Sequence, residues 1–567
     1  MIRFLLPVLL ALSPLTLADD PARSPADPAQ AGIASANAYA TDAGMEVLAK
    51  GGNAFDAAIA VSATLGLVEP ESSGLGGGAF MLLRVAGEDR EVFIDARERA
   101  PLAASRDMFL DADGKANREL SVNGALAAGI PGLPAGLDHL AKKYGRLPLS
   151  QSLAPAIRLA HEGWRFGPKN AAFLGYRRDV LRRSPAAAKL FLRGGEVPAE
   201  GTLMRNKEYA RTLEILAAQG ADGFYKGDFA RRLARGVREA GGIWTEQDLA
   251  QYTVVEREPL RIRHRGFDIV TAPPPSSGGV ALATMLKVLE GYDYPRLGKA
   301  ERSHLFIEAM RRAYRDRALY LGDPDFVQAP VDMLVSDAYA AGLRASIHPA
   351  RATPSDLLPG VDAAPLRPDT SHFSIIDTEG NLVAVTQTVN LPYGSALMVP
   401  GTGFLLNNEM DDFSVKPGVP NAFGLVGDDA NAIAPGKRPL SSMTPSFLVG
   451  PERTAVLGTP GGSRIITMVL LGLVELMQGE GAQATAAAPR FHHQYLPDVV
   501  QAEADAFTPE QIAALEAMGH DVQAGERTWG NMQVVLWNHH DGGVETGTDP
   551  RWKGVGKGTS TEASVYR

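Results

Sequence analysis

Two strand-like segments joined by a tight turn constrain this chain more than any other part of its sequence. The first covers residues 371–377 (SHFSIID) and the second covers residues 382–390 (LVAVTQTVN). Both are rich in β-branched and apolar residues, and the four residues between them (TEGN) favour a turn. The pattern predicts a β-hairpin in which Gly380 takes the left-handed position of a type I turn with a bulge, so that Asp377 faces Asn381.

The register of this hairpin places Thr370, at the start of the first strand, opposite Thr388. Because side chains alternate between the two faces of a strand, Thr386, Thr388 and Asn390 share one face, and Thr370 looks toward this polar row. A shift of one residue would place Thr370 opposite Val389 instead. A threonine at a strand start can present a nucleophile, but threonine is also an ordinary strand residue, so the hairpin alone leaves both roles open.

Composition excludes several classes of function. The formal charge of -9, without a long basic run, argues against binding to nucleic acid. The absence of cysteine excludes disulfides, thiol catalysis and thiolate metal sites. The chain has no His-Glu-x-x-His spacing and no Gly-x-Ser-x-Gly elbow, and its two adjacent histidine pairs diverge on helix or strand. We therefore predict no metal and no cofactor. Because the cysteine thiol and the serine elbow are both absent, Thr370 is favoured as the nucleophile.

Residues 1–18 have the pattern of an export signal, with a cationic start, a short apolar run and a small-residue cleavage site that ends at Ala18. The apolar run is too short to span a bilayer, and Pro7 and Pro14 weaken an anchor. The later apolar cluster 465–477 fits a buried helix. We predict a periplasmic or secreted protein with no membrane anchor.

Helical patterns cover much of the rest of the chain. Residues 41–50 form one, Asn53 can cap a second that runs to residue 67, and further helices are expected over 131–226, 280–290 and 302–320. The glycine-rich segment 72–78 follows a helix and precedes a strand at 79–85, so close backbone packing fits it better than a phosphate loop. The proline-rich segment 349–368 is expected to be an exposed connection.

Three groups of polar residues suit the recognition of a small charged substrate. Arg97 follows a strand at 91–95 and can clamp a carboxylate, although a local ion pair with Asp95 or Glu98 also fits. Glu409 and Asp412 can hold an ammonium group or a cation, although an exposed acidic turn is the default for such a segment. Finally, residues 457–463 run from a strand through two glycines toward a helix beginning near residue 463, where backbone N–H groups can stabilise an oxyanion.

Together these segments resemble the gamma-glutamyltransferase (gamma-glutamyltranspeptidase) family of the bacterial exported type, from about Ala34 to the C-terminus. The resemblance rests on the ordered occurrence of GGNAFDAA at 51–58, DARE at 95–98, PPSSGG at 274–279, TSH at 370–372, NNEMDDF at 407–413, RPLSSM at 438–443 and PGGSR at 460–464.

The resemblance implies an α+β fold of the N-terminal nucleophile hydrolase type, an αββα sandwich of two stacked, mainly antiparallel sheets between helix layers. It also implies one precursor that cuts itself between Asp369 and Thr370. The products would be a large subunit, residues 19–369, and a small catalytic subunit, residues 370–567, which stay together as a heterodimer and form one composite domain.

Residue roles are carried over from the family motifs. Thr370 would be the nucleophile, its freed α-amino group the base, and Thr388 the residue that holds its hydroxyl. The remaining roles would fall to Arg97, Ser441 and Ser442 for the substrate α-carboxylate, to Asn390, Glu409 and Asp412 for its α-amino group, and to the Gly461 and Gly462 amides for the oxyanion.

The implied reaction transfers the γ-glutamyl group of glutathione, or of another γ-glutamyl amide, to water or to an amino acid or dipeptide acceptor. Cephalosporin and glutaryl acylases share the architecture and are the nearest enzymatic alternative, but their substrates lack the α-amino group that Glu409 and Asp412 would bind. A non-enzymatic alternative is an exported solute-binding protein, which would remain a single chain.

One position departs from the family pattern. In bacterial relatives the loop matching 417–429 forms a lid, and a tyrosine on it bonds to the asparagine matching Asn390. This chain has Phe423 there, so the ring is kept and the hydroxyl is lost. We expect a lid that opens more readily than in those relatives.

Overall fold

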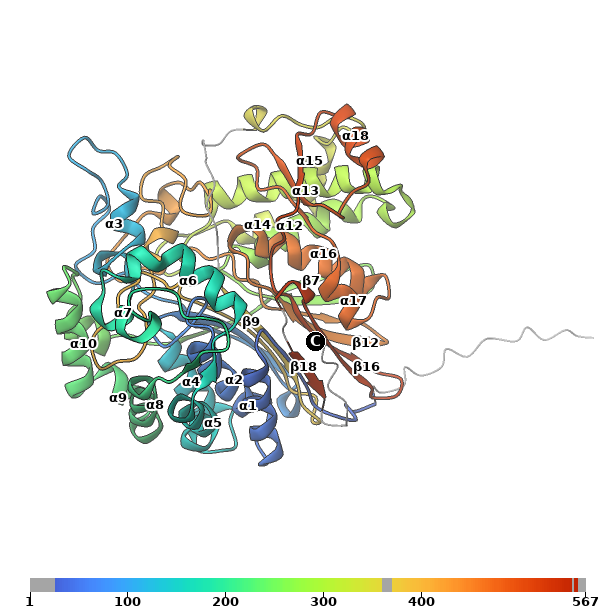
Figure 1. The fold of residues 1–567 in the computed structure, drawn as a ribbon. Helices are drawn as coiled ribbons and strands as arrows, with labels where there is room; N and C mark the ends of the chain where they lie inside the picture. The colour runs from blue at the N-terminus through green and yellow to red at the C-terminus, as the bar shows by residue number, and fades with distance from the viewer. Residues whose placement is uncertain (1–25, 359–369, 553–554, 559–567) are drawn as a thin grey trace, which may run out of the picture.

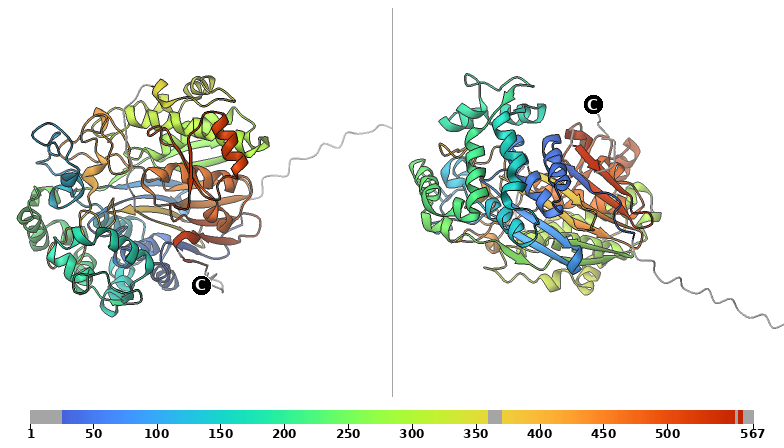
Figure 2. Two further views of the ribbon diagram at one scale, coloured as in Figure 1. Left: turned by 45° about the horizontal axis from the view of Figure 1, so that its top comes forward. Right: turned by 90° about the horizontal axis from the view of Figure 1, so that it is seen from below.

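Two β-sheets lie face to face between two layers of helices (Figure 1). The structure, a computed structural model, describes residues 26–358, 370–552 and 555–558. Figure 2 shows the layers from two other directions, with the teal and green helices on one side of the sheets and the yellow-green helices on the other. This arrangement is the predicted αββα sandwich.

Both large sheets are antiparallel throughout their described strands. In spatial order, the first contains β18 (Val555–Gly558), β1 (Gly32–Ser35), β9 (Ser371–Ile376), β10 (Leu382–Thr388), β2 (Gly78–Val85), β3 (Arg90–Ala96) and β6 (Val255–Arg257). The second contains β17 (Val544–Thr548), β16 (Gln533–Asn538), β12 (Arg453–Gly458), β11 (Ser446–Val449), β8 (Phe267–Thr271) and β7 (Leu260–His264). Smaller sheets pair β4 (Trp164–Arg165) with β5 (Leu203–Met204), and join β13 (Phe491–His492), β14 (Val500–Glu503) and β15 (Val522–Gly525).

Each sheet is covered on its outer face by its own helices. The first sheet packs against α1 (Ala38–Ala49), α2 (Ala54–Val68) and α4 (Leu133–Lys143), and the second against α12 (Gly278–Glu290), α16 (Ile465–Met477) and α17 (Ala482–Ala487). Around the first group lie α3 (Arg118–Val122), α5 (Leu149–Glu162), α6 (Pro168–Leu181), α7 (Pro185–Phe191), α8 (Lys207–Gln219), α9 (Ala221–Tyr225), α10 (Gly227–Glu239) and α11 (Glu246–Ala250). Around the second lie α13 (Lys299–Tyr320), α14 (Val331–Leu334), α15 (Asp337–Ala345) and α18 (Pro509–Ala517).

Local sequence signals account for several of these boundaries. Asn53 caps α2 through a capping box with Asp56, as its side chain accepts from the Asp56 amide at 3.1 Å and the Asp56 carboxylate accepts from the Asn53 amide at 3.0 Å. The helix α16 has the predicted bounds. Within the described ranges we find no helix with the length and apolar character needed to cross a bilayer.

The β9–β10 hairpin has the predicted register. Ile376 pairs with Leu382 and Ser371 with Gln387, and Gly380 has a φ of +79°. The strand β10 ends at Thr388, two residues earlier than predicted. Asn390 lies beyond it with a φ of +76°, so its direction does not follow from strand alternation.

The two faces of this hairpin differ in chemistry. Phe373 and Ile375 belong to the apolar cluster formed with α2, whereas His372 points between the sheets. The His372 Nδ1 lies 2.8 Å from the Thr386 hydroxyl, and its ring is so close to Gly458 that a Cβ there would lie 2.3 Å from the ring. Burial lowers the pKa of His372 to about 3, so this histidine is neutral at neutral pH.

Glycines bring a neighbouring segment onto the end of β10, as predicted for residues 72–78. A Cβ on Gly77 would lie 2.0 Å from the Thr388 carbonyl oxygen, and a Cβ on Gly76 would lie 2.0 Å from the Leu405 carbonyl oxygen. Only glycine allows this approach.

The described part of the connection that precedes Thr370 is mostly exposed, as predicted, but it is anchored at Ala352 and Ser355, which are buried. Ser355 is buried, and its amide donates to Asp498 at 2.7 Å. Residues 359–369, with the predicted cleavage site at Asp369, and residues 1–25, with the predicted signal, lie outside the described residues.

Candidate functional site

A small pocket lies where the strands β9 and β10 meet the loops that follow β3 and β10. Its lining residues are Arg97, Thr370, Thr388, Asn390, Glu409, Asp412, Phe423, Ser441, Ser442, Met443, Gly462 and Ile465. The structure therefore brings together the predicted site residues that it describes, apart from Gly461, which lines the adjoining cavity. These residues come from segments more than 300 positions apart in the sequence.

The two threonines of the hairpin face each other at one end of the pocket. Their hydroxyl oxygens are 3.3 Å apart, and both side chains are almost fully buried. The Thr388 hydroxyl also accepts a hydrogen bond of 2.8 Å from the Asn390 amide, which fixes its position. This geometry lets Thr388 orient the Thr370 hydroxyl.

Arg97 lines the same pocket and is fully buried. Its guanidinium donates to Asp412 at 2.6 Å and to Glu409, and its Nε donates to the Pro439 carbonyl oxygen at 3.2 Å. Glu98 is farther away, at 3.6 Å. Arg97 is therefore more than a partner in a local ion pair, and the exposed acidic turn that was the default for residues 409–412 does not form, because these acids are folded onto Arg97.

Three buried carboxyl groups surround this one guanidinium. Burial raises the pKa values of Glu98, Glu409 and Asp412, and the positive charge of Arg97 opposes the rise. Burial also disfavours the charged form of Arg97, but the three acids hold its pKa above the usual value. Because the acids outnumber the cation, the cluster has a place for a further positive group such as a proton or a substrate ammonium.

A second buried cation was missed by the sequence analysis. Arg317, on α13, donates to the Ser277 hydroxyl at 3.0 Å and approaches the Ser442 hydroxyl at 3.5 Å. Burial lowers its pKa. Helical spacing could have indicated that Arg317 is buried, because it lies three residues after Tyr314 on the buried face of α13.

Hydrogen bonds from Ser277 fix the segment that contains Ser441 and Ser442. The Ser441 carbonyl oxygen accepts from both the amide and the hydroxyl of Ser277, at 2.8 and 2.7 Å. The Ser441 hydroxyl accepts from the Met443 amide at 3.1 Å. The two serines thus have a fixed place beside Arg97.

The Gly461–Gly462 turn forms a third wall. Both residues have positive φ, +145° and +57°, and a Cβ on Gly461 would lie 2.4 Å from the Met468 side chain. A 3₁₀ turn, Gly462–Arg464, precedes α16, so the helical segment begins one residue before the predicted position. Amide groups at such a turn suit a developing negative charge.

Phe423 lines the pocket and is 7% exposed. Its loop is tied to the acidic segment, because the Asn421 side chain donates to Asp412 at 3.3 Å and the Ala422 amide donates to Asp411 at 2.8 Å. The enclosed space is only about 20 Å³. The pocket must therefore widen before an amino acid head group can enter.

One cluster outside the pocket has side chains of metal-ligating type. His304, Glu308 and His520 lie close together and are buried. The Glu308 carboxylate already accepts from Arg312 at 2.6 Å and from Arg311 at 3.2 Å, and His304 bonds to His520 at 2.8 Å. Two guanidinium groups beside the only carboxylate disfavour a metal cation there.

Known proteins share this architecture and sequence. A family model described as Gamma-glutamyltranspeptidase matches residues 40–559. A glutathione hydrolase proenzyme of Escherichia coli is 42% identical, over 92% of this chain and 90% of its own length. An acylase ACY 1 proenzyme of Pseudomonas sp. (strain V22) is 36% identical, over 91% of each chain. The crystal structure of a cephalosporin acylase from Bacillus halodurans matches with a TM-score of 0.83 and 28% identity, covering 98% of this chain and 100% of that one.

The stacked antiparallel sheets and their helix layers define an N-terminal nucleophile hydrolase fold. The family match covers nearly the whole described chain, and the relatives match over most of their length. The chain belongs to the gamma-glutamyltranspeptidase family of enzymes.

Proposed function

We propose that the protein is a self-cleaving gamma-glutamyltranspeptidase that also acts as a glutathione hydrolase. The observation that carries the proposal is that Arg97, Glu409 and Asp412 line the same pocket as the Thr370–Thr388 pair. A free amino acid head group needs a cation for its carboxylate and anions for its ammonium, side by side. A nucleophile at the other end of the same pocket would then meet the γ-carbonyl group.

Within this proposal, Arg97, Ser441 and Ser442 bind the α-carboxylate of the donor. Asn390, Glu409 and Asp412 bind its ammonium group, which replaces the proton that the acid-rich cluster would otherwise retain. When the substrate binds, its carboxylate takes the place of the protein carboxylates at Arg97. Its ammonium group takes the place of Arg97 at Glu409 and Asp412.

The acylation step transfers one acyl group and returns one proton. The Thr370 hydroxyl oxygen attacks the γ-carbonyl carbon, and its proton moves to the free α-amino group of Thr370. The amides of Gly461 and Gly462 hold the negative oxygen. The carbon–nitrogen bond then breaks, the leaving nitrogen takes the proton from the α-ammonium group, and a γ-glutamyl ester remains on Thr370.

The ester is then resolved by water or by an amine. Water gives glutamate and completes hydrolysis, and the amine of an amino acid or dipeptide gives a new γ-glutamyl amide. In both cases the attacking group gives its proton to the Thr370 amine, which passes it to the departing hydroxyl oxygen. Free α-amines titrate at about pH 7.7–8.0, which suits this role near neutral pH.

Self-cleavage would create that base. The Thr370 hydroxyl attacks the carbonyl carbon of Asp369, the peptide bond breaks, and the Thr370 nitrogen takes the proton. Water hydrolyses the resulting ester to give the Asp369 carboxylate and a free Thr370 amine. The fragments 19–369 and 370–567 would remain associated, because β9 and β10 lie between β1 and β2 in one sheet.

An acylase acting on a glutaryl or related side chain is the second candidate, and the 36% identity to an acylase proenzyme favours it. Such a substrate carries no ammonium group, so Glu409 and Asp412 would then lack a partner. A γ-glutamyl anilide and a glutaryl anilide distinguish the two functions, and we expect a large preference for the first.

For location, we propose export to the periplasm or medium with removal of residues 1–18. Sequencing of the large fragment from the native host should then begin at Asp19.

Substitution of Thr370 tests the proposed function directly. Wild-type protein should give two bands on a denaturing gel, and the smaller fragment should begin Thr-Ser-His-Phe. Thr370→Ala should stay uncut and inactive, and Thr370→Ser should keep some of both activities. Ser371→Ala is the matched control, because it removes the neighbouring hydroxyl, and it should still be cut before Thr370. A Thr370→Ala protein that matures and turns over γ-glutamyl anilide would overturn the proposal.

A further inference from the structure

The start of β9, next to Thr370, is held by a buried polar network that has no role in the proposal above. Ser371, the first residue of β9, is fully buried, and its hydroxyl donates to a carboxylate oxygen of Glu69 at 2.9 Å. Because side chains alternate along a strand, Ser371 lies on the face opposite Thr370, which packs against α2. Glu69 directly follows α2. The strand that carries the nucleophile is thus tied to the helix layer behind it.

Glu69 is itself held by a cation. Lys169, in the first turn of α6, donates to the same Glu69 oxygen at 3.0 Å and to the Ser72 hydroxyl at 3.0 Å. The side chains of Glu69 and Lys169 are 3% and 12% exposed. The Glu69 carbonyl oxygen also accepts from the amides of Ser72 and Ser73, at 2.9 and 3.2 Å. Both the backbone and the carboxylate of Glu69 therefore have fixed positions.

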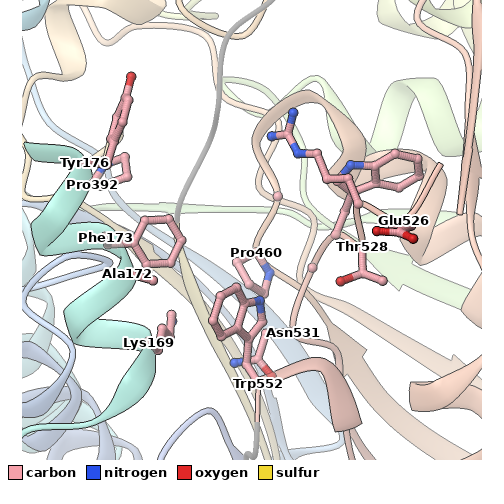
Figure 3. Close-up of a pocket in the computed structure, with 14 residues that line it drawn as sticks. Lys169, Ala172, Phe173, Tyr176, Pro392, Pro460, Glu526, Thr528, Asn531 and Trp552 are labelled. Carbon is pink, nitrogen blue, oxygen red and sulfur yellow. The ribbon is translucent and has the colours of Figure 1, made fainter. Parts of the chain in front are cut away.

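Figure 3 shows Lys169 on α6, on one wall of a cavity of about 370 Å³. Gly461 of the proposed oxyanion turn lines the same cavity. This cavity leaves space beside the Lys169 side chain, so the position has room for a larger cation.

The partner strand is tied to the same turn. Gln387, which pairs with Ser371 across the hairpin, donates to the Ser73 hydroxyl at 3.0 Å and to the Ser62 carbonyl oxygen at 3.3 Å. The Ser62 hydroxyl donates in return to the Gln387 side chain. Both strands at the open end of the hairpin are therefore bonded to α2 and the turn that follows it.

The end of β9 needs such support. Among the strands that the structure describes, β1 pairs with β9 only as far as Phe373, so Ser371 has a strand neighbour on the β10 side alone. After the proposed cut, Thr370 is joined covalently to the protein only through Ser371. A buried ion pair adds little to stability, because removing two charges from water costs about as much as their attraction returns. The pair of Glu69 with Lys169 is therefore better explained by the geometry that it fixes.

We propose that Glu69 and Lys169 are positioning residues, which hold the cut end of β9 through Ser371 and so keep the Thr370 hydroxyl and amine aligned for catalysis. The inference rests on the proposed function and adds two residues to it. Both belong to the proposed large fragment, whereas Ser371 and Thr370 belong to the small one. The contact between the fragments would thus set the position of the nucleophile.

The first test removes the hydroxyl that links the network to the strand. Ser371→Ala should lower kcat for hydrolysis of γ-glutamyl anilide about 10-fold or more, because a small displacement of a reacting group is costly. The inhibition constant of glutamate should stay within about 2-fold of the wild type, because the residues that bind the head group are unchanged. Self-cleavage should stay within about 3-fold, because the uncut chain holds Thr370 from both sides.

Variants of the ion pair test the rest of the network. Glu69→Gln keeps the size of the side chain and removes its charge, and it should lower kcat about 3-fold or more, since charge-assisted hydrogen bonds are the stronger ones. The double variant with Ser371→Ala should be no worse than Ser371→Ala alone, within about 2-fold, if both act through one contact. Lys169→Met should lower kcat as Glu69→Gln does, and Lys169→Arg should restore it.

A matched control comes from the same strand. Ser374 is also fully buried in β9, and its hydroxyl donates to the Gln533 carbonyl oxygen at 3.1 Å. Ser374→Ala therefore loses a similar hydrogen bond farther from the cut end, and it should keep the wild-type kcat. A merely structural role would lower Tm and the yield of matured protein in these variants but leave kcat per matured enzyme unchanged.

The outcomes separate this inference from the proposed function. An unchanged kcat in Ser371→Ala, or an equal fall in Ser374→Ala, would overturn the positioning role while the wild type still matures and turns over its donor. A loss in Lys169→Met that Lys169→Arg does not recover would overturn the role of the cation. Failure of the wild type to cut itself or to release anilide would instead overturn the proposed function.

Discussion

Replacing Asp412 by asparagine should separate recognition of the substrate ammonium from every other step. Asp412 accepts from Arg97 at 2.6 Å, and its side chain is 10% exposed. Asparagine keeps the size of the side chain and removes its charge. The variant should therefore fold and cut itself, but it should bind a γ-glutamyl head group poorly.

The size of the effect follows from burial. Removing one partner of a desolvated charge pair costs about 2–5 kcal/mol. Asp412 is somewhat more accessible than Glu409, whose side chain is 1% exposed, and Glu409 remains to bind the ammonium group. We therefore expect the lower part of this range, about 2–3 kcal/mol, which corresponds to about a 30- to 150-fold loss in kcat/KM for γ-glutamyl anilide.

The assay compares that donor with glutaryl anilide, which lacks only the ammonium group. If Asp412 binds the ammonium, the loss should appear with the γ-glutamyl donor alone, and the ratio of the two kcat/KM values should fall by the same 30- to 150-fold, or about 2–3 kcal/mol. Two bands on a denaturing gel check maturation. An equal loss with both donors would mean that Asp412 acts only by supporting Arg97, and no loss would remove it from the site.

Three further predictions concern Arg97, Phe423 and His372. Arg97→Lys should lower kcat/KM for γ-glutamyl anilide at least about 30-fold while cleavage of the chain continues, because lysine cannot reproduce the forked contacts; an unchanged kcat/KM would contradict this role. Phe423→Tyr should restore a hydroxyl that can bond to Asn390, worth about 0.5–1.5 kcal/mol, slow lid opening and shift the transfer-to-hydrolysis ratio at fixed acceptor concentration; if both that ratio and the inhibition constant of glutamate stay the same, the lid does not gate the enzyme. The unfolded state protonates a histidine below about pH 6.5, whereas the folded protein protonates His372 only near pH 3. Stability should therefore fall as the pH drops from 6.5 toward 3, and His372→Gln should flatten the dependence of Tm on pH in this range; equal slopes would show that His372 does not contribute.

Several elements of the fold could be predicted because their signals are local. The Gly380 turn sets the pairing of β9 with β10, and this pairing places Thr370 opposite Thr388. The capping box at Asn53 and the largely apolar run of α16, which Glu475 interrupts near its end, likewise depend on residues a few positions apart. The predicted end of the second strand was less accurate. The strand-like sequence continues to Asn390, but β10 ends at Thr388 and Asn390 lies in a left-handed bend beyond it.

The sequence by itself determined the hairpin that presents Thr370 and, through its family motifs, the set of residues that gather around it. Only the tertiary structure decided that Glu409 and Asp412 are buried against Arg97 and that Arg317 approaches Ser442. Turn type and strand alternation are set by neighbouring residues. Burial and charge pairing depend on which distant segments pack together, so they are established only when both sheets and their helices are in place.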